Sequence, residues 1–191
     1  MPTRGIIRRL WPGPRDQVRD HLRRLDVEDR QLRFGGHASA SHIAAYCEGL
    51  DWSRGLVLGY VVAGQVRGLG ELKLVGNAPA RSAELAASVE GPFQNRGIRT
   101  ALVRRLVIAA RNRLIGQIRM VCLIDNGKAV RMARRLDGAL VFAGGEAETR
   151  IEPPWPTPWT WLEEAPLEFG GAEVEQPGAA VDPEHTSAPI T

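Results

Sequence analysis

The chain has 191 residues, of which 43% are hydrophobic and 25% are charged, the balance of an ordinary globular protein. It holds no run of about 18 apolar residues, which excludes a membrane-spanning helix, and the apolar pair at residues 6–7 is too short for a signal peptide. Cys47 and Cys122 lie far apart and lack the spacing of metal or redox sites, so we expect two buried thiols in a reducing compartment, the cytoplasm.

Charge is distributed unevenly along the chain. All 25 Lys and Arg residues lie at or before Arg150 against 14 acidic residues, a net charge of +11, whereas residues 151–191 hold 8 acidic residues and no basic one. A basic body attracts anionic ligands, and an acidic tail screens it. The arginines are scattered without interleaved aromatic residues, so a solvated surface is favoured over a nucleic-acid interface, which stays the weaker alternative.

The first third of the chain predicts a strand followed by helices. Residues 6–10 form an apolar and basic run that ends at a turn rich in Pro and Gly. Residues 16–25 repeat apolar side chains at the spacing of a buried helical stripe, and His21, which lies beside Arg23 in this segment, is expected to be a surface residue. Ser39 or Ser41 caps a second predicted helix, which carries its apolar residues at helical spacing up to Leu50.

The middle of the chain is rich in β-forming residues. Two runs, residues 55–62 and 65–75, are separated by Ala63-Gly64, which predicts a hairpin. A third run, residues 82–89, alternates as expected for a strand. It leads through a short turn into a predicted amphipathic helix at residues 98–114.

The remaining elements complete the predicted fold class. We expect a strand at residues 117–124, a helix capped by Asp125 or Asn126, and two closing strands at residues 139–142 and 146–152. The order of elements is typical of an α/β protein with a mixed, mostly antiparallel sheet of about seven strands and helices on both faces.

The C-terminal part is predicted to form no further fold. Three tryptophans lie among prolines at residues 155–161, and we expect them to pack against the body. From Glu163 onward the sequence is acidic and rich in Gly, Pro and Ala, a composition typical of disorder. The expected organisation is one domain at residues 1–162 and a disordered tail at residues 163–191.

The most informative motif lies between the third middle strand and the helix after it: Gln94-Asn95-Arg96-Gly97-Ile98-Arg99-Thr100. The N-terminus of a helix exposes unpaired N–H groups and a partial positive charge, so a turn that leads directly into a helix suits a diphosphate. Gly97 lets the backbone approach the anion, and Arg96 or Arg99 adds a charge-assisted contact.

This motif resembles the acyl-CoA loop of the GNAT N-acetyltransferases, whose pattern is Gln/Arg-x-x-Gly-x-Gly/Ala. Residues 83–89 resemble the family's fourth strand, and residues 126–132 resemble its later Asn-x-x-Ala-x-x-Leu helix. The order of elements agrees from about residue 6 to residue 152. The resemblance implies the GNAT fold, acetyl-CoA as the acyl donor, and transfer of the acetyl group to a primary amine by direct attack.

The resemblance also implies which residues hold the cofactor. Groups at the end of the strand would bind the pantetheine arm and polarise the thioester carbonyl, the loop would bind the pyrophosphate, and the later helix would add two contacts. The implied cofactor-binding residues are Ser88, Val89, Gln94, Asn95, Arg96, Gly97, Ile98, Arg99, Thr100, Asn126 and Ala129.

Two positions depart from the family pattern. The third loop position is small in the family and is Arg99 here, and Ala133 stands where the family often has a Tyr that protonates the departing thiolate. Neither Tyr46 nor Tyr60 is near that position in sequence. These departures favour, as the alternative function, a non-catalytic acyl-CoA-binding module of the same fold.

An attacking amine must lose a proton, so the proposed chemistry needs a carboxylate or a relayed water. Glu84 is the first candidate base and Glu71, on the neighbouring strand, is the second; each is alternatively an outward-facing strand carboxylate. His37 and His42 flank the helix expected to line the acceptor site, and are alternatively surface residues.

Other partners are only partly restricted by the sequence. No set of His, Cys and carboxylate residues has metal-ligand spacing, so we expect no metal. The acceptor is expected to be a small-molecule or peptide amine, with polyamines, amino acids, antibiotics and protein N-termini all open. The closing strands offer an edge for a homodimer.

Overall fold

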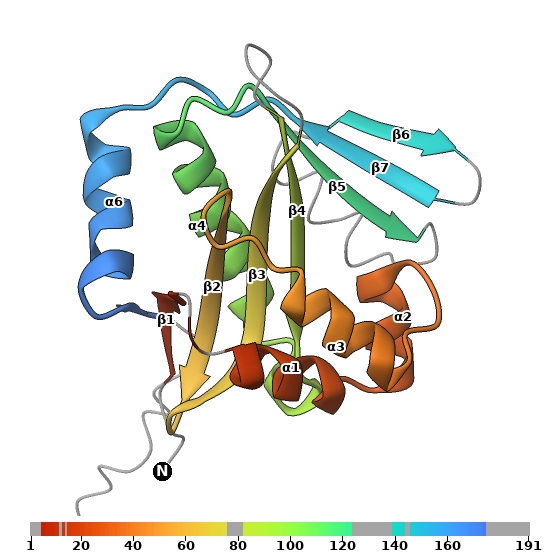
Figure 1. Cartoon of the computed structure of the whole chain (residues 1–191). Helices are drawn as coiled ribbons and strands as arrows, with labels where there is room; N and C mark the ends of the chain where they lie inside the picture. Colours follow the sequence, from red (N-terminus) through yellow and green to blue (C-terminus); the bar gives the residue numbers. More distant parts are fainter. Residues whose placement is uncertain are drawn as a thin grey trace, which may run out of the picture.

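The computed structural model describes residues 5–11, 13, 15–75, 82–123, 139–143 and 146–174 (Figure 1). Its strands form one sheet of eight in the order β6-β7-β5-β4-β3-β2-β1-β8. The strands are β1 Ile6–Arg9, β2 Gly55–Val62, β3 Gln65–Val75, β4 Ser82–Val89, β5 Gln117–Leu123, β6 Ala139–Ala143, β7 Glu146–Ile151 and β8 Ala172–Glu173. The helices are α1 Arg15–Arg24, α2 Val27–Phe34, α3 Ala40–Glu48, the 3-10 helix η1 Gly91–Phe93, α4 Ile98–Asn112 and α6 Pro158–Phe169.

Neighbouring strands pair antiparallel throughout the described sheet except at β4 and β5, which are parallel. The predicted mixed, mostly antiparallel sheet is therefore confirmed, with the two-residue β8 as an additional edge strand. α2 was not predicted, and the helix expected after residue 125 lies outside the described residues.

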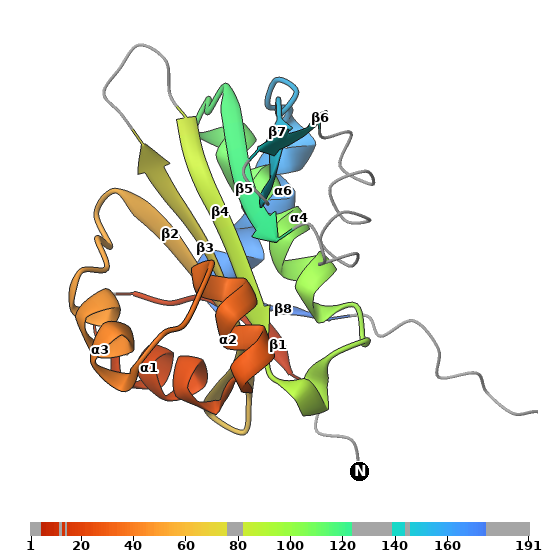
Figure 2. The same ribbon diagram turned by 90° about the vertical axis from the view of Figure 1, so that its right-hand side faces the viewer.

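Helices cover both faces of the sheet, as Figure 2 shows. On one face α1 and α3 contribute Val18, Leu22 and Ile43 to a core with Val57 and Leu69 of the sheet. On the other face α4 packs with its buried side on the sheet, against the strand side chains that point away from α1 and α3. This second core includes Leu58, Leu72, Leu85, Leu102 and Leu106. The alternation of side chains along each strand thus separates two apolar cores.

Glycines in β3 let α4 lie close to the sheet. A Cβ placed at Gly70 would lie 3.0 Å from the Leu106 side chain, and one at Gly68 would lie 3.4 Å from Leu102. Because larger residues there would push the helix away, these two positions help to fix the N-terminus of α4 beside the end of β4.

Residues 163–174 are ordered, so the predicted domain boundary after residue 162 is wrong. α6 continues to Phe169, and β8 pairs with β1 through Ile6 and Ile7. The physical reason is a polar contact: the Asn112 side chain of α4 donates to the Glu164 carboxylate at 2.7 Å. An acidic composition predicts disorder only where the acidic groups lack such partners. Residues 175–191 lie outside the described residues.

The three tryptophans do not pack against the body, contrary to the prediction. Trp155, Trp159 and Trp161 are 82%, 75% and 55% exposed. The polar contacts of Thr160 and Glu164 with Asn112 fix the rotation of α6, and this rotation turns Trp159 and Trp161 outward. Trp155 lies on the segment before the helix. None of the helices within the described residues is long and apolar enough to span a membrane.

Candidate functional site

β4 and β5 pair over a short stretch and then diverge. Their described pairing covers three positions and ends at Glu84 and Arg119. β4 continues from there to Val89, and β5 continues to Leu123. Figure 1 shows the two strands separating toward α2. This side of β4 therefore presents main-chain hydrogen-bonding groups that β5 does not pair.

The direction of those groups follows from one hydrogen bond. The Glu90 N–H donates to Arg67 O of β3 at 3.1 Å. Main-chain groups alternate in direction along a strand, so the N–H groups of Ala87 and Val89 point away from β3, toward β5. In agreement, Val89 O accepts from the Gln94 side chain at 3.0 Å and not from β3. Two N–H donors thus face the space between the diverging strands.

The loop after β4 turns directly into α4. Asn95 and Gly97 have φ of 59° and 75°, in the left-handed region, which Asn and Gly tolerate best. Gly97 is the N-cap of α4 and has no side chain with which to cap the first N–H groups of the helix. The Ile98 side chain is 1% exposed and belongs to the core, so Ile98 offers a ligand its N–H alone. The loop has the geometry of an anion site.

The basic residues of this loop differ in their surroundings. Arg96 is exposed, and its guanidinium lies 5.7 Å from the Phe93 ring. Arg99 lies 3.9 Å from the Asp29 carboxylate of α2. Burial lowers the pKa of Arg99, and the Asp29 charge opposes this effect. Asp29 also accepts from the Gln94 amide, so α2 is attached to the loop by one carboxylate.

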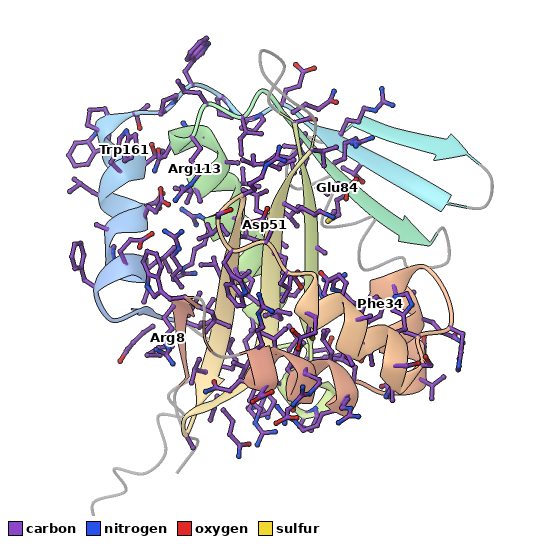
Figure 3. The ribbon with its side chains drawn as sticks, in the orientation of Figure 1. Arg8, Phe34, Asp51, Glu84, Arg113 and Trp161 are labelled. Atoms are coloured by element: carbon purple, nitrogen blue, oxygen red, sulfur yellow. The ribbon has the colours of Figure 1, made fainter. Side chains whose placement is uncertain are left out.

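Glu84 lies at the point where β4 and β5 separate, as Figure 3 shows. Its side chain is 51% exposed and lies 3.4 Å from Arg119 on β5. Val89 lies five positions after Glu84 along the strand, a distance of about 16 Å. An extended ligand that binds the loop at one end and follows β4 would therefore bring its other end near this carboxylate.

Glu71 has quite different surroundings. Its carboxylate accepts from Arg33 of α2 at 2.5 Å and from the Tyr46 hydroxyl of α3. The side chains of Arg33 and Glu71 are only 8% and 9% exposed. Burial raises the pKa of Tyr46 above its ordinary value, and the Glu71 charge adds to the shift. Both Glu71 oxygens are occupied, which favours a role in attaching α2 and α3 to β3 over proton abstraction.

His21 is completely buried, so its predicted surface position is wrong. Nδ1 lies 3.1 Å from Glu90 and Nε2 lies 3.0 Å from the Ser88 hydroxyl. Glu90 also accepts from Arg24 and Arg67, each at 2.9 Å. Burial lowers the pKa of His21, and the hydrogen bond that its ring donates to Glu90 opposes this shift. A neutral ring with its proton on Nδ1 accepts from Ser88 through Nε2.

This network also affects the pKa of Glu90. Burial alone would raise it, but the hydrogen bonds from His21, Arg67 and Arg24 hold it below its ordinary value. The ionised carboxylate therefore joins α1 to the end of β4 next to the loop.

The structure brings most of the predicted site residues together but changes the role of one. The Ser88 side chain is engaged by His21, and alternation directs its N–H toward β3, so the donors toward β5 come from its neighbours. Asn126 and Ala129 lie outside the described residues. Asp29, Arg33 and Glu90 were not anticipated. Within the described residues no cluster of three His, Cys, Asp or Glu side chains is arranged to hold a metal ion.

Neither the protein-family models nor the curated proteins match the sequence. Solved structures do match the fold. The GNAT domain of S. lividans PAT has a TM-score of 0.67 and 19% identity, over 78% of this chain and 90% of that domain. Spermidine N-acetyltransferase from Vibrio cholerae, in complex with CoA and spermine, has a TM-score of 0.60 and 17% identity, over 78% of this chain and 96% of that one.

A third structure places the same fold inside a longer protein. The cAMP-binding acyltransferase from Mycobacterium smegmatis has a TM-score of 0.52 and 22% identity, over 78% of this chain but only 44% of that one. At these identities the matches establish a common fold.

Proposed function

We propose that this chain, which has the fold of the GNAT N-acetyltransferases, transfers an acetyl group from acetyl-CoA to a primary amine by direct attack. One observation carries the proposal: the unpaired side of β4 ends at the left-handed turn that opens α4. A single extended ligand with a diphosphate at one end satisfies both features, because the turn binds anions and the strand edge binds amides.

Acetyl-CoA binding is assigned to main-chain groups. The N–H groups of Ile98, Arg99 and Thr100 would bind the pyrophosphate, with exposed Arg96 adding charge. The amides of the pantetheine arm would pair with the side of β4 that faces β5. A main-chain N–H at the thioester carbonyl would stabilise the negative charge that develops on its oxygen during attack.

Glu84 is the proposed general base. It is the candidate carboxylate that remains exposed, and it lies at the far end of the diverging strands from the loop. The acceptor ammonium would transfer a proton to it, directly or through a water. The amine nitrogen would then bond to the carbonyl carbon and the C–S bond would break. The nitrogen loses a second proton, and this proton would neutralise the departing thiolate, so that CoA leaves as the thiol.

The alternative function, a non-catalytic acyl-CoA-binding module, is favoured by the surroundings of Arg99. Its guanidinium is directed at Asp29 and not at the loop's anion site. In this alternative the loop binds the cofactor and no turnover follows, so binding and turnover must be measured separately.

Isothermal titration with acetyl-CoA tests the binding step. We expect micromolar affinity for the wild type and loss of binding in Gly97→Glu, because the new carboxylate would occupy the anion site at a left-handed position. Gly36→Glu is the matched control, since a Cβ there meets nothing within 4 Å and its φ is unrestricted. Absence of binding to the wild type would contradict the proposal.

Release of CoA thiol, measured with a panel of polyamines, amino acids and peptides, tests the chemical step. Glu84→Gln keeps the shape and loses the basic oxygen, so we expect turnover to fall by about 100-fold or more at unchanged acetyl-CoA affinity. Unchanged turnover in Glu84→Gln would remove this residue from the mechanism. Binding without turnover for every acceptor would support the alternative.

A further inference from the structure

α6 presents its apolar side chains to the outside. Thr160, Glu164 and Leu167 lie on one side of the helix and are buried against the body. On the opposite side Leu162 and Phe169 are 63% and 89% exposed. Figure 3 shows Trp161 at the outer side of α6. We call the outward group the α6 face; it consists of Trp159, Leu162, Pro166 and Phe169, and Trp155 and Trp161 are exposed beside it.

The charges beside this face are already neutralised. Glu163 lies 3.0 Å from Arg104 of α4, and Glu168 lies 2.8 Å from Arg9 of β1. The remaining acidic residue of α6, Glu164, is buried. A helix that faces water normally carries charged residues on its outer side. The α6 face instead combines large apolar side chains with paired charges, a composition typical of an interaction surface.

The face is smaller than one partner's share of a standard interface. Its three large side chains, Trp159, Leu162 and Phe169, are 63% to 89% exposed. At roughly 200 Å² for each large side chain they present roughly 450 Å², against about 800 Å² per partner in a standard interface. An interface of this size is typical of a weak dimer whose population depends on concentration.

We propose that the α6 face binds the α6 face of a second copy of this chain, with the two helices antiparallel about a two-fold axis. Positions 159, 162, 166 and 169 follow the alternating three-and-four spacing of a helix-pairing seam. The two-fold axis sets Trp159 against Phe169 of the second copy, and Leu162 against Pro166 of the second copy.

A second copy fits this face because the face is compatible with itself. A two-fold interface brings each patch against an identical patch, so unpaired charges in it would lie near like charges of the other subunit and repel them. Here Glu163 and Glu168 are compensated within their own subunit, and only apolar side chains remain for the contact. The dimer uses neither the loop before α4 nor the diverging strands, so it goes beyond the proposed acyl transfer.

Sedimentation velocity of the full chain, from about 1 to about 100 μM, tests the proposal. At the highest concentration the wild type is expected to approach a mass twice that of the 20.9 kDa chain. Leu162→Glu places an unpaired charge at the centre of the seam, so we expect its dimer dissociation constant to rise by at least about 100-fold. Val27→Glu is the matched control: Val27 is 64% exposed on α2, and the variant should remain dimeric.

A wild type that is monomeric at the highest concentration would overturn the proposal, because the face would then belong to a different partner. A dimer of unchanged affinity in Leu162→Glu would also overturn it and would place the interface elsewhere, for instance at an edge of the sheet. Circular dichroism shows whether each variant is folded. If Leu162→Glu is not, Phe169→Glu, at the most exposed position of the face, decides between the same outcomes.

Discussion

α1 and α6 differ in which side chains they turn to water, although both are fixed by buried polar contacts. α1 buries Val18 and Leu22 around His21, and it exposes Asp16 and Arg23. α6 exposes its aromatic residues and buries acidic and hydroxyl groups instead. In both helices a buried polar side chain with partners on another element determines the rotation. In α1 the apolar stripe and the buried polar contact lie on the same side of the helix, so hydropathy predicts the rotation correctly. In α6 the apolar residues and the buried polar contacts lie on different sides, so a prediction from hydropathy fails.

The largest expected effect comes from removing the polar group of α1. His21→Ala leaves a cavity and deprives Ser88 and Glu90 of their partner. We expect the free energy of unfolding to fall by about 3 kcal/mol, measured by urea denaturation. Asp20→Ala, at an exposed position of the same helix, is the control and should change it by less than about 0.5 kcal/mol. Equal effects of the two variants would show that the His21 network does not hold α1.

The corresponding change in α6 is expected to cost less. Glu164→Ala leaves Asn112 without its carboxylate partner, but Asn112 keeps its contacts with Thr160. We expect a loss of about 2 kcal/mol in urea denaturation. Glu163→Ala removes the exposed neighbour and should change stability by less than about 0.5 kcal/mol. A larger loss for Glu163→Ala would mean that the outward side of α6 holds the helix.

The smallest expected effect is a dependence of folding stability on pH, which comes from His21 of α1. Burial lowers the folded-state pKa of His21 below 6.5, so the unfolded chain takes up a proton first as the pH falls. This contribution to stability is complete above pH 6.5 and is lost as the pH falls toward the folded-state value. The slope is at most about 1.4 kcal/mol per pH unit for one proton. Melting temperatures of wild type and His21→Gln between about pH 7 and about pH 5 measure it; parallel curves would contradict it.

The sequence predicted those parts of the fold that local periodicity determines. The hairpin of β2 and β3, the strand β4 and the helix α4 all lie close to the predicted ranges, because alternation and helical spacing are read within one segment. α2 has no such signal: none of its apolar side chains is fully buried, and it is attached through Asp29 and Arg33.

The candidate site shows the same limit. The loop motif is contiguous, so Gln94 and Gly97 were found from sequence alone. His21 and Glu90 are 69 positions apart and were missed, because no local pattern links them. Glu84 and Glu71 had similar sequence contexts; only the structure shows that Glu71 has both oxygens occupied and Glu84 is exposed.

The short contact between β4 and β5 divides the sheet into two parts. Strands β8, β1, β2, β3 and β4 form one ladder, β5, β7 and β6 form the other, and three residue pairs join them. The chain passes from one ladder to the other through the loop and α4. An acyl-CoA arm between β4 and β5 would form the hydrogen bonds that the two strands do not form with each other, and it would act as a substitute strand. Cofactor loading would then slow amide hydrogen exchange on both ladders at once, and so make the two halves of the sheet open as a single cooperative unit.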